Sequence, residues 1–135
     1  MTDAERIDVV KYRIENAEKT LAEVAAHIQN GYYNTAVNRM YYACFYAASA
    51  LLVANRIEVK SHDGVRQMLG KHFVAAGHLS IAHGKFYTLI FSKRSAGDYE
   101  DFINYTRDAA QALYPQTEDF VKEIKSLVDS WFANA

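Results

Sequence analysis

The sequence predicts an all-α protein, an antiparallel bundle of four to five helices, and three observations carry this prediction. Half of the 135 residues are hydrophobic, and only 6 are glycine and 1 is proline, so long segments run without helix breakers. Apolar residues recur at helical spacing over most of the chain. Residues 40–54 are apolar on nearly every side of a helix, which is typical of a buried central element. We expect a single domain over residues 1–135, because this length allows one core.

The first segment has the clearest periodicity in the sequence. Apolar side chains alternate at steps of three and four from Ile7 to Ile28. This pattern predicts one helix of about 25 residues that starts at Thr2 or Asp3 and ends at Asn30-Gly31. The tight stop indicates that the next helix returns antiparallel to it.

The second helix, within residues 32–55, has two different faces. One face is expected to meet the first helix and carries Val37, Met40 or Tyr41, Cys44, Ala48 and Leu51. The other face is rich in hydroxyls and rings and carries Thr35, Asn38, Arg39, Tyr42, Tyr46 and Ser49. Tyrosine combines apolar area with one polar group, which suits an interface or a groove. Two alternatives stay open for this face: cover by later helices of the same chain, or a homodimer or partner contact through Arg39, Tyr42 and Tyr46.

The remaining chain is expected to form shorter helices. A third helix is predicted over residues 63–76, with Val65, Leu69, His72, Phe73 and Ala76 on one side, and Gly77 should end it. A fourth is predicted from about Ser80 to Lys93-Arg94, with Ile81, Phe86, Leu89 and Ile90 buried. The stretch SAGDYED is the next expected break. The last helix should start near Thr106, and Pro115 should kink it or divide it into two.

The sequence predicts neither a membrane-spanning helix nor an export signal. The apolar run of residues 40–54 would extend about 22 Å as a helix, short of the roughly 20 residues that cross a bilayer. The segment MTDAERIDVV is charged from its start and has no apolar signal core. Cys44 is the one cysteine and cannot form an internal disulfide. We expect a cytoplasmic protein without a membrane partner.

Charge is distributed unevenly along a chain whose net charge is −1. Residues 1–30 carry a net −2, residues 31–97 carry +6 and residues 98–135 carry −5. This pattern has two interpretations: mutual neutralisation of packed segments, or a local anion site in the middle segment.

No metal site or cofactor is predicted. The five histidines show no HExxH or other close pairing, and Cys44 is alone, so zinc ligands do not converge. The sequence contains no P-loop, GxGxxG or GxSxG motif, which removes the usual support for nucleotide hydrolysis and for a serine hydrolase.

Two short motifs are the candidate binding sites. In KSHDG, Lys60 and His62 stand beside a helix N-terminus, where free backbone N–H groups favour an anion; the alternative is an ordinary helix cap. In RSAGDY, Arg94 stands four residues before Asp98 and five before Tyr99. The alternative for this motif is an ion pair between Arg94 and Asp98 that fixes a turn.

Taken together, NTAVNRMYYACFYAASALL, KSHDGV and RSAGDY resemble the HEPN family, specifically its small stand-alone prokaryotic branch. The resemblance covers about residues 12–128. It implies an antiparallel helical bundle that dimerises so that the polar motifs of two protomers meet across a cleft. Many members of the family are metal-independent endoribonucleases and toxins neutralised by a minimal nucleotidyltransferase, and others bind nucleotides or RNA without catalysis.

The resemblance assigns site residues in the RSAGDY motif, and at one of these positions the sequence departs from the family's pattern. Arg94 takes the place of the family's arginine, and Asp98 and Tyr99 follow it in the motif. Ribonuclease members carry a histidine four to six residues after the arginine, where this chain has Tyr99. A phenol, with an ordinary pKa near 10, is a poor general base at neutral pH. His62 could supply the missing imidazole from another loop.

Two functions remain as alternatives at this point. The first is a nucleotide- or RNA-binding component of a toxin–antitoxin pair that binds or slowly cuts RNA. Its cleft is expected to be lined by the catalytic candidates Arg94, Asp98 and Tyr99, and Lys60 and His62 are further candidates for binding the phosphate. The second is a non-catalytic scaffold that docks a minimal nucleotidyltransferase through its tyrosine face. Arg66 and His72 also fit the arginine–histidine spacing, but six helical steps place them about 120° apart around one helix, so we treat this match as accidental.

Overall fold

The computed structural model describes residues 1–99 and 103–134, except for the side chains of residues 97–99. Its helices are α1 (Asp3–Gln29), α2 (Tyr33–Ala54), α3 (His62–Leu69), α4 (Ile81–Tyr99) and α5 (Arg107–Ala133), and the short π-helical turn η1 (Gly70–Val74) continues α3. The described residues contain no strand. The predicted all-α bundle is therefore confirmed.

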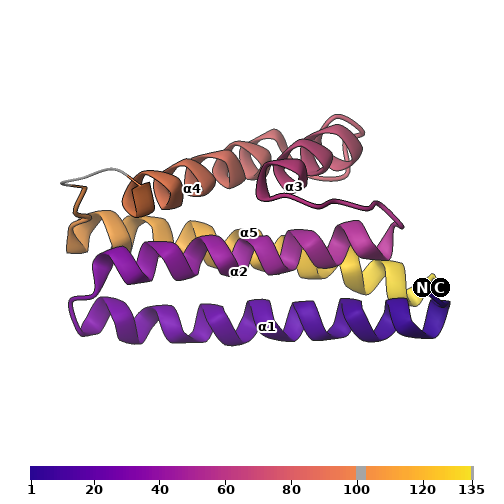
Figure 1. Cartoon of the computed structure of the whole chain (residues 1–135), viewed down its shortest axis with the longest axis horizontal. Helices are drawn as coiled ribbons and strands as arrows, with labels where there is room; N and C mark the ends of the chain where they lie inside the picture. The colour runs from indigo at the N-terminus through magenta and orange to yellow at the C-terminus, as the bar shows by residue number, and fades with distance from the viewer. Residues whose placement is uncertain (100–102, 135) are drawn as a thin grey trace.

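Helix α2 is the central element of the bundle. It runs antiparallel to α1 and lies alongside α5, while α3 and α4 form a layer on the side of α2 that faces away from α1 (Figure 1). Helices α1, α3, α4 and α5 all contact α2. Both chain termini lie at the same end of the bundle (Figure 1).

The sequence of α2 explains its central place. Its buried residues are mostly small, and many of them are completely inaccessible: Ala36, Met40, Tyr41, Ala43, Cys44, Ala47, Ala48 and Ala50. Alanines on several sides allow neighbouring helices to approach closely at native packing density. None of the helices in the described part of the chain is both long and apolar enough to cross a membrane.

Helix α1 follows the predicted boundaries closely. Thr2 is its N-cap and forms a capping box with Glu5, in which each side chain accepts a hydrogen bond from the other residue's backbone N–H. Gly31 follows the C-cap with φ at +80°, a conformation that a residue without a Cβ adopts at little cost. The chain then reverses into α2.

The fourth helix is rotated relative to the prediction. Phe86 and Ile90 are buried as predicted, but Ile81 and Leu89 are 67% and 41% exposed. Tyr87 is buried in their place and packs against Phe120 of α5, with ring centroids 5.6 Å apart. The helix therefore presents a narrower face to α2 and α5 than the apolar pattern indicated.

The third segment and its exit also differ in detail from the prediction. Val65, Leu69 and Phe73 are buried, but His72 and Ala76 are exposed. The π-helical turn changes the helical spacing after Leu69, so residues counted at α-helical spacing no longer share a face. Gly77, with φ at +82°, ends the segment as predicted.

One predicted helix end is wrong, and the structure excludes one of the two alternatives predicted at Pro115. Helix α4 continues past Arg94 to Tyr99, with Gly97 inside it. A glycine in a helix costs only about 1 kcal/mol, which flanking helical residues can offset. Helix α5 starts after Thr106, as predicted, but runs through Pro115 as one helix instead of dividing there.

Candidate functional site

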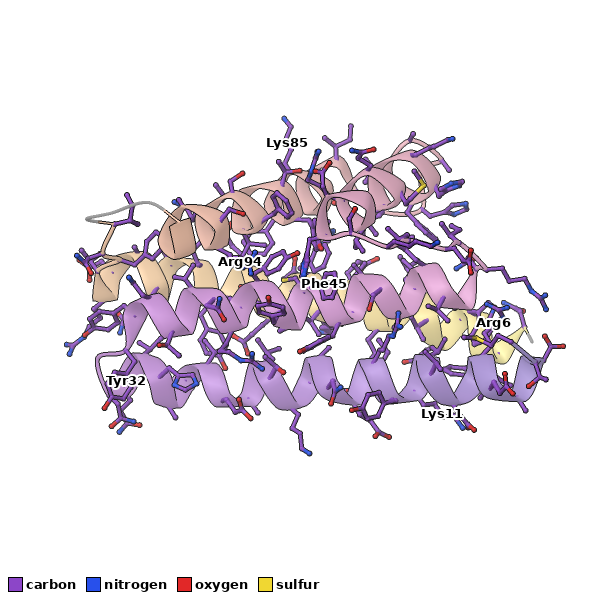
Figure 2. All side chains as sticks on the ribbon, viewed as in Figure 1. Arg6, Lys11, Tyr32, Phe45, Lys85 and Arg94 are labelled. Carbon is purple, nitrogen blue, oxygen red and sulfur yellow. The ribbon has the colours of Figure 1, made fainter. Side chains whose placement is uncertain are left out.

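Arg94 lies on α4 and reaches the space between α4 and α2, where it meets two adjacent tyrosines (Figure 2). Its Nη2 donates a hydrogen bond to the hydroxyl of Tyr42 at 3.0 Å. The guanidinium carbon lies 5.6 Å from the ring centroid of Tyr41 and 5.4 Å from that of Tyr42. The negative faces of the rings attract a cation at these distances. Arg94 is half-buried and lies inside α4, which continues to Tyr99, so the prediction that Arg94 ends a helix is wrong.

His62 is the first residue of α3 and binds the other side of the same tyrosine pair. Its Nδ1 lies 2.7 Å from the hydroxyl of Tyr41, a hydrogen bond that occupies this ring nitrogen. The imidazole stacks on Phe45, with ring centroids 4.4 Å apart and planes at 26°. Burial lowers the pKa of His62 below its ordinary value of 6.5, and the charge of Arg94 lowers this pKa further. The imidazole is therefore neutral at neutral pH.

Arg94 and His62 thus come together on α2 although they are far apart in sequence. The rings of Tyr41 and Tyr42 lie 5.7 and 5.9 Å from the imidazole centroid, and both rings also contact the guanidinium. We call Tyr41, Tyr42, His62 and Arg94 the Arg–His cluster. It combines a permanent cation, which can stabilise charge on a phosphate, with a neutral imidazole, which can accept a proton.

Tyr41 is the member of the Arg–His cluster that sequence reasoning missed. The sequence leaves Met40 or Tyr41 on the face toward the first helix, but the ring of Tyr41 points toward α3 and α4, where it contacts Phe91 and Tyr87. Burial raises the pKa of Tyr41 to about 12, so the phenol keeps its proton. The helical spacing gave no signal for Tyr41, because adjacent helical residues point about 100° apart and Tyr42 was already expected on the face opposite the first helix.

The KSHDG motif forms a cap and also borders a pocket. The Ser61 hydroxyl caps α3 by accepting a hydrogen bond from the Gly64 N–H at 2.9 Å, so ordinary capping is present. Lys60 is exposed and lines a pocket of about 740 Å³ together with His62. Arg94 is not among the residues that line this pocket. Lys60 and Arg94 therefore lie on different sides of His62.

The rest of the RSAGDY motif cannot be placed in the site. The side chains of Asp98 and Tyr99 lie outside the described part of the structure. The accidental match, Arg66 and His72, shows no sign of a site: Arg66 pairs with Asp63 at 2.7 Å and His72 is exposed.

The tyrosine face of α2 is covered in part by the chain itself. Tyr42 and Tyr46 are half-buried, and Ser49 is buried with its hydroxyl bonded to the Tyr46 carbonyl. Arg39 donates a hydrogen bond to the Thr20 hydroxyl at 3.3 Å, and its guanidinium carbon lies 5.6 Å from the centroid of the Tyr42 ring. Cover by the same chain, one of the two alternatives for this face, therefore applies to its inner part.

One serine–histidine–aspartate chain occurs at the surface. Ser80 Oγ lies 2.8 Å from Nδ1 of His83, whose Nε2 lies 2.8 Å from Oδ2 of Asp119. The Ser80 hydroxyl also accepts the backbone N–H of His83, as an N-cap does. These hydrogen bonds link the start of α4 to α5, and we assign the three side chains a structural role. In the described residues, no three histidine, cysteine or carboxylate side chains are grouped for a metal ion.

Comparisons with known proteins agree with this fold. The family model described as HEPN domain matches residues 10–127. A UPF0332 protein of Thermotoga maritima is 30% identical over 93% of this chain and 95% of its own length. "Putative toxin MJ0605" of Methanocaldococcus jannaschii is 35% identical over 83% of both chains. "Putative toxin MJ0142" of the same organism is 31% identical over 87% of this chain and 80% of its own length. The chain belongs to the HEPN family.

Proposed function

We propose that this chain is the HEPN component of a prokaryotic toxin–antitoxin pair and that its Arg–His cluster binds and cleaves RNA. The observation that carries this proposal is the meeting of Arg94 and His62 on the Tyr41–Tyr42 pair. Two relatives that carry the word toxin in their names support the biological role.

His62 and Arg94 have complementary roles in this reaction. In the tautomer whose Nδ1–H donates to the phenol oxygen of Tyr41, Nε2 of neutral His62 is the basic nitrogen and accepts the proton of the ribose 2′-hydroxyl. The 2′-oxygen forms a bond to phosphorus, the bond from phosphorus to the 5′-oxygen breaks, and the imidazolium returns its proton to the 5′-oxygen. Arg94 stabilises the negative charge that the phosphate gains on the way. The lowered pKa of His62 keeps the imidazole in its basic form at neutral pH.

The proposal accounts for the departure from the family's motif. Tyr99 stands in sequence where ribonuclease members have histidine. In the proposed site, His62 supplies the imidazole from the start of α3, and Tyr41 holds it there through Nδ1. Lys60, two residues earlier, adds a second cation for the RNA backbone.

RNA cleavage by purified protein in the presence of a chelator tests the proposal. Arg94→Ala and His62→Ala should each reduce the cleavage rate by about a hundredfold, in the range that one proton-transfer or charge-stabilising group contributes. His72→Ala is the matched control, because His72 is exposed and outside the cluster. Circular dichroism verifies that all variants are folded. Equal rates for His62→Ala and His72→Ala would refute the role of His62.

Growth inhibition tests the toxin role separately from the chemistry. Expression of the wild-type chain without its neighbouring gene product should arrest growth, and Arg94→Ala should relieve the arrest at equal protein level. A wild-type chain that leaves growth unaffected would contradict the toxin role even if RNA is cleaved in vitro.

A non-catalytic scaffold is the second candidate function, and the half-buried Arg39 and Tyr46 favour it. In this function the outer part of the tyrosine face docks a minimal nucleotidyltransferase or a second copy of the chain. Co-expression with a nucleotidyltransferase encoded beside the gene, followed by co-purification, tests docking. Tyr46→Ala should abolish the complex without loss of helicity, and light scattering of the isolated chain measures the homodimer. A stable complex that survives Tyr46→Ala would exclude this face.

A further inference from the structure

The second half of α4, which carries Arg94, packs on the bundle less firmly than the first half. The buried residues of α4 end at Ile90, and the described side chains of residues 91–96 are half-buried or exposed. Hydrophobic burial therefore fixes the first half of the helix more strongly than the second. Gly97, in the last turn, weakens the helix further. The position of Arg94 thus depends more on polar contacts than the positions of the buried residues do.

The segment before α5 reaches this second half of α4. Tyr105 donates a hydrogen bond from its hydroxyl to the backbone carbonyl of Lys93, the residue before Arg94. The ammonium of Lys93 lies 5.8 Å from the centroid of the Tyr105 ring, within the range of a cation–π contact. A carbonyl oxygen has two lone pairs, so this bond can add to the one that the carbonyl accepts within the helix. Tyr105 therefore holds the backbone of α4 next to Arg94.

Asn34, the second residue of α2, fixes the backbone of Tyr105 in turn. Its Nδ2 donates to the carbonyl of Ile103 at 3.0 Å, and its Oδ1 accepts the backbone N–H of Tyr105 at 2.8 Å. A side-chain amide satisfies both backbone groups in one orientation only, because the reversed amide would place donor against donor and acceptor against acceptor. Asn34 therefore holds the chain on both sides of residue 104.

We call Asn34, Tyr105 and the Lys93 carbonyl the α2–α4 clasp. The start of α2, the end of α4 and the start of α5 lie at the same end of the bundle, opposite the chain termini (Figure 1). Arg94 bonds to Tyr42, which lies about two helical turns beyond Asn34 on α2. The clasp and the bond between Arg94 and Tyr42 therefore link the same two helices at neighbouring levels.

We propose that Asn34 and Tyr105 are positioning residues that hold Arg94 against Tyr41 and Tyr42 in the Arg–His cluster. They act through the backbone of α4, since Tyr105 bonds to the carbonyl that precedes Arg94 and Asn34 fixes Tyr105. Without the clasp, the second half of α4 moves on α2 and the guanidinium loses its fixed place beside the two rings. The inference deepens the proposed function and rests on it only for the effect on RNA cleavage.

The pKa of His62 reports the position of Arg94, because the charge of Arg94 is one of the two causes that lower this pKa. NMR titration of the imidazole in the full chain measures it without any substrate. Tyr105→Phe removes only the hydroxyl, and Asn34→Leu removes both amide hydrogen bonds at nearly the same side-chain shape. Each variant should raise the pKa of His62 toward its ordinary value of 6.5, in the same direction as Arg94→Gln and by a smaller amount.

Tyr33→Phe is the matched control. Tyr33 precedes Asn34 on α2, and its hydroxyl accepts a hydrogen bond from Nε of Arg107 at 3.1 Å. The control therefore removes a phenol hydroxyl at the same end of the bundle, where the lost bond joins α2 to α5 instead of reaching α4. It should leave the pKa of His62 at the wild-type value. Circular dichroism verifies that all variants are folded.

A double-mutant cycle with Arg94→Gln separates positioning of Arg94 from a general structural role. If Tyr105 acts through Arg94, Tyr105→Phe changes the pKa of His62 in the wild-type background and leaves it unchanged in the Arg94→Gln background. Equal changes in both backgrounds would overturn the proposal. Values of the His62 pKa in Tyr105→Phe and Asn34→Leu that match Tyr33→Phe would overturn it as well.

RNA cleavage supplies a second measurement. Tyr105→Phe should lower kcat by about tenfold or more with little change in KM, because a displacement of about 1 Å in a charge-stabilising group can cost about a hundredfold in rate. Cleavage that depends on Arg94 and His62 but is equal in Tyr105→Phe and Tyr33→Phe would retain the proposed reaction and refute the clasp. A raised His62 pKa in Tyr105→Phe, in a protein that cleaves no RNA, would retain the clasp and refute the proposed reaction.

Discussion

The phenol oxygen of Tyr41 lies 2.7 Å from Nδ1 of His62, and this contact joins the central helix to the first residue of α3. The same phenol ring lies under the guanidinium of Arg94. Tyr41 therefore orients the imidazole and brings it into the electrostatic field of the arginine. Because the pKa of Tyr41 is raised to about 12, the phenol stays protonated throughout the pH range in which His62 titrates.

The coupling of Arg94 to His62 is directly measurable. Arg94→Gln should raise the pKa of His62 toward its ordinary value of 6.5, because one of the two causes that lower it is a repulsive cation. NMR titration of the imidazole resonances measures this change. Arg107→Gln on α5 is the control and should leave the His62 titration unchanged. An unchanged pKa in Arg94→Gln would mean that the two side chains are not neighbours in solution.

The lowered pKa of His62 also predicts how stability depends on pH. The unfolded chain binds this proton near pH 6.5, and the folded chain binds it only at lower pH. The free energy of unfolding should therefore fall as pH decreases from about 7.5 to about 5. Urea denaturation at both pH values should show a smaller decrease for His62→Gln than for the wild type. His72→Gln should retain the full wild-type decrease, and an equal decrease in both variants would contradict this assignment.

The alanines of α2 set how closely its neighbours approach. Ala47 is completely buried, so Ala47→Leu should destabilise the protein by about 1–3 kcal/mol through overpacking. Ala112→Leu is a matched control on α5, where the side chain is exposed, and should change stability by less than about 0.5 kcal/mol. Equilibrium urea denaturation compares the two. Equal effects would show that α2 is not the close-packed centre of the bundle.

The continuity of α5 through Pro115 predicts a stabilising substitution. Proline removes one backbone hydrogen bond from a helix interior, so Pro115→Ala should raise the free energy of unfolding by about 1–3 kcal/mol. Thermal denaturation followed at 222 nm measures the change. Gln111→Ala, an exposed substitution one turn earlier, should have an effect of only a few tenths of a kcal/mol. A loss of stability in Pro115→Ala would indicate that the ring packs against a neighbour.

Apolar spacing and composition were enough to predict the fold class and the order of the main helices. The spacing of apolar residues from Ile7 to Ile28 places α1 within a residue or two of its observed bounds, because a helix with one buried face must repeat every 3.6 residues. The apolar composition of residues 40–54 likewise fixed α2 as the central element, since such a helix must be covered on most sides. The three motifs of the HEPN resemblance identified the family that the comparisons establish.

Which side chains meet depends on how the helices pack against one another. Local spacing gives a helix a buried face but does not give the rotation or crossing of that helix against its neighbours, so Ile81 and Leu89 were assigned to the core and lie at the surface. For the same reason the sequence left open whether Met40 or Tyr41 faces the first helix. The approach of Arg94 and His62 depends on how α3 and α4 both lie across α2, and no pattern within either segment records that geometry.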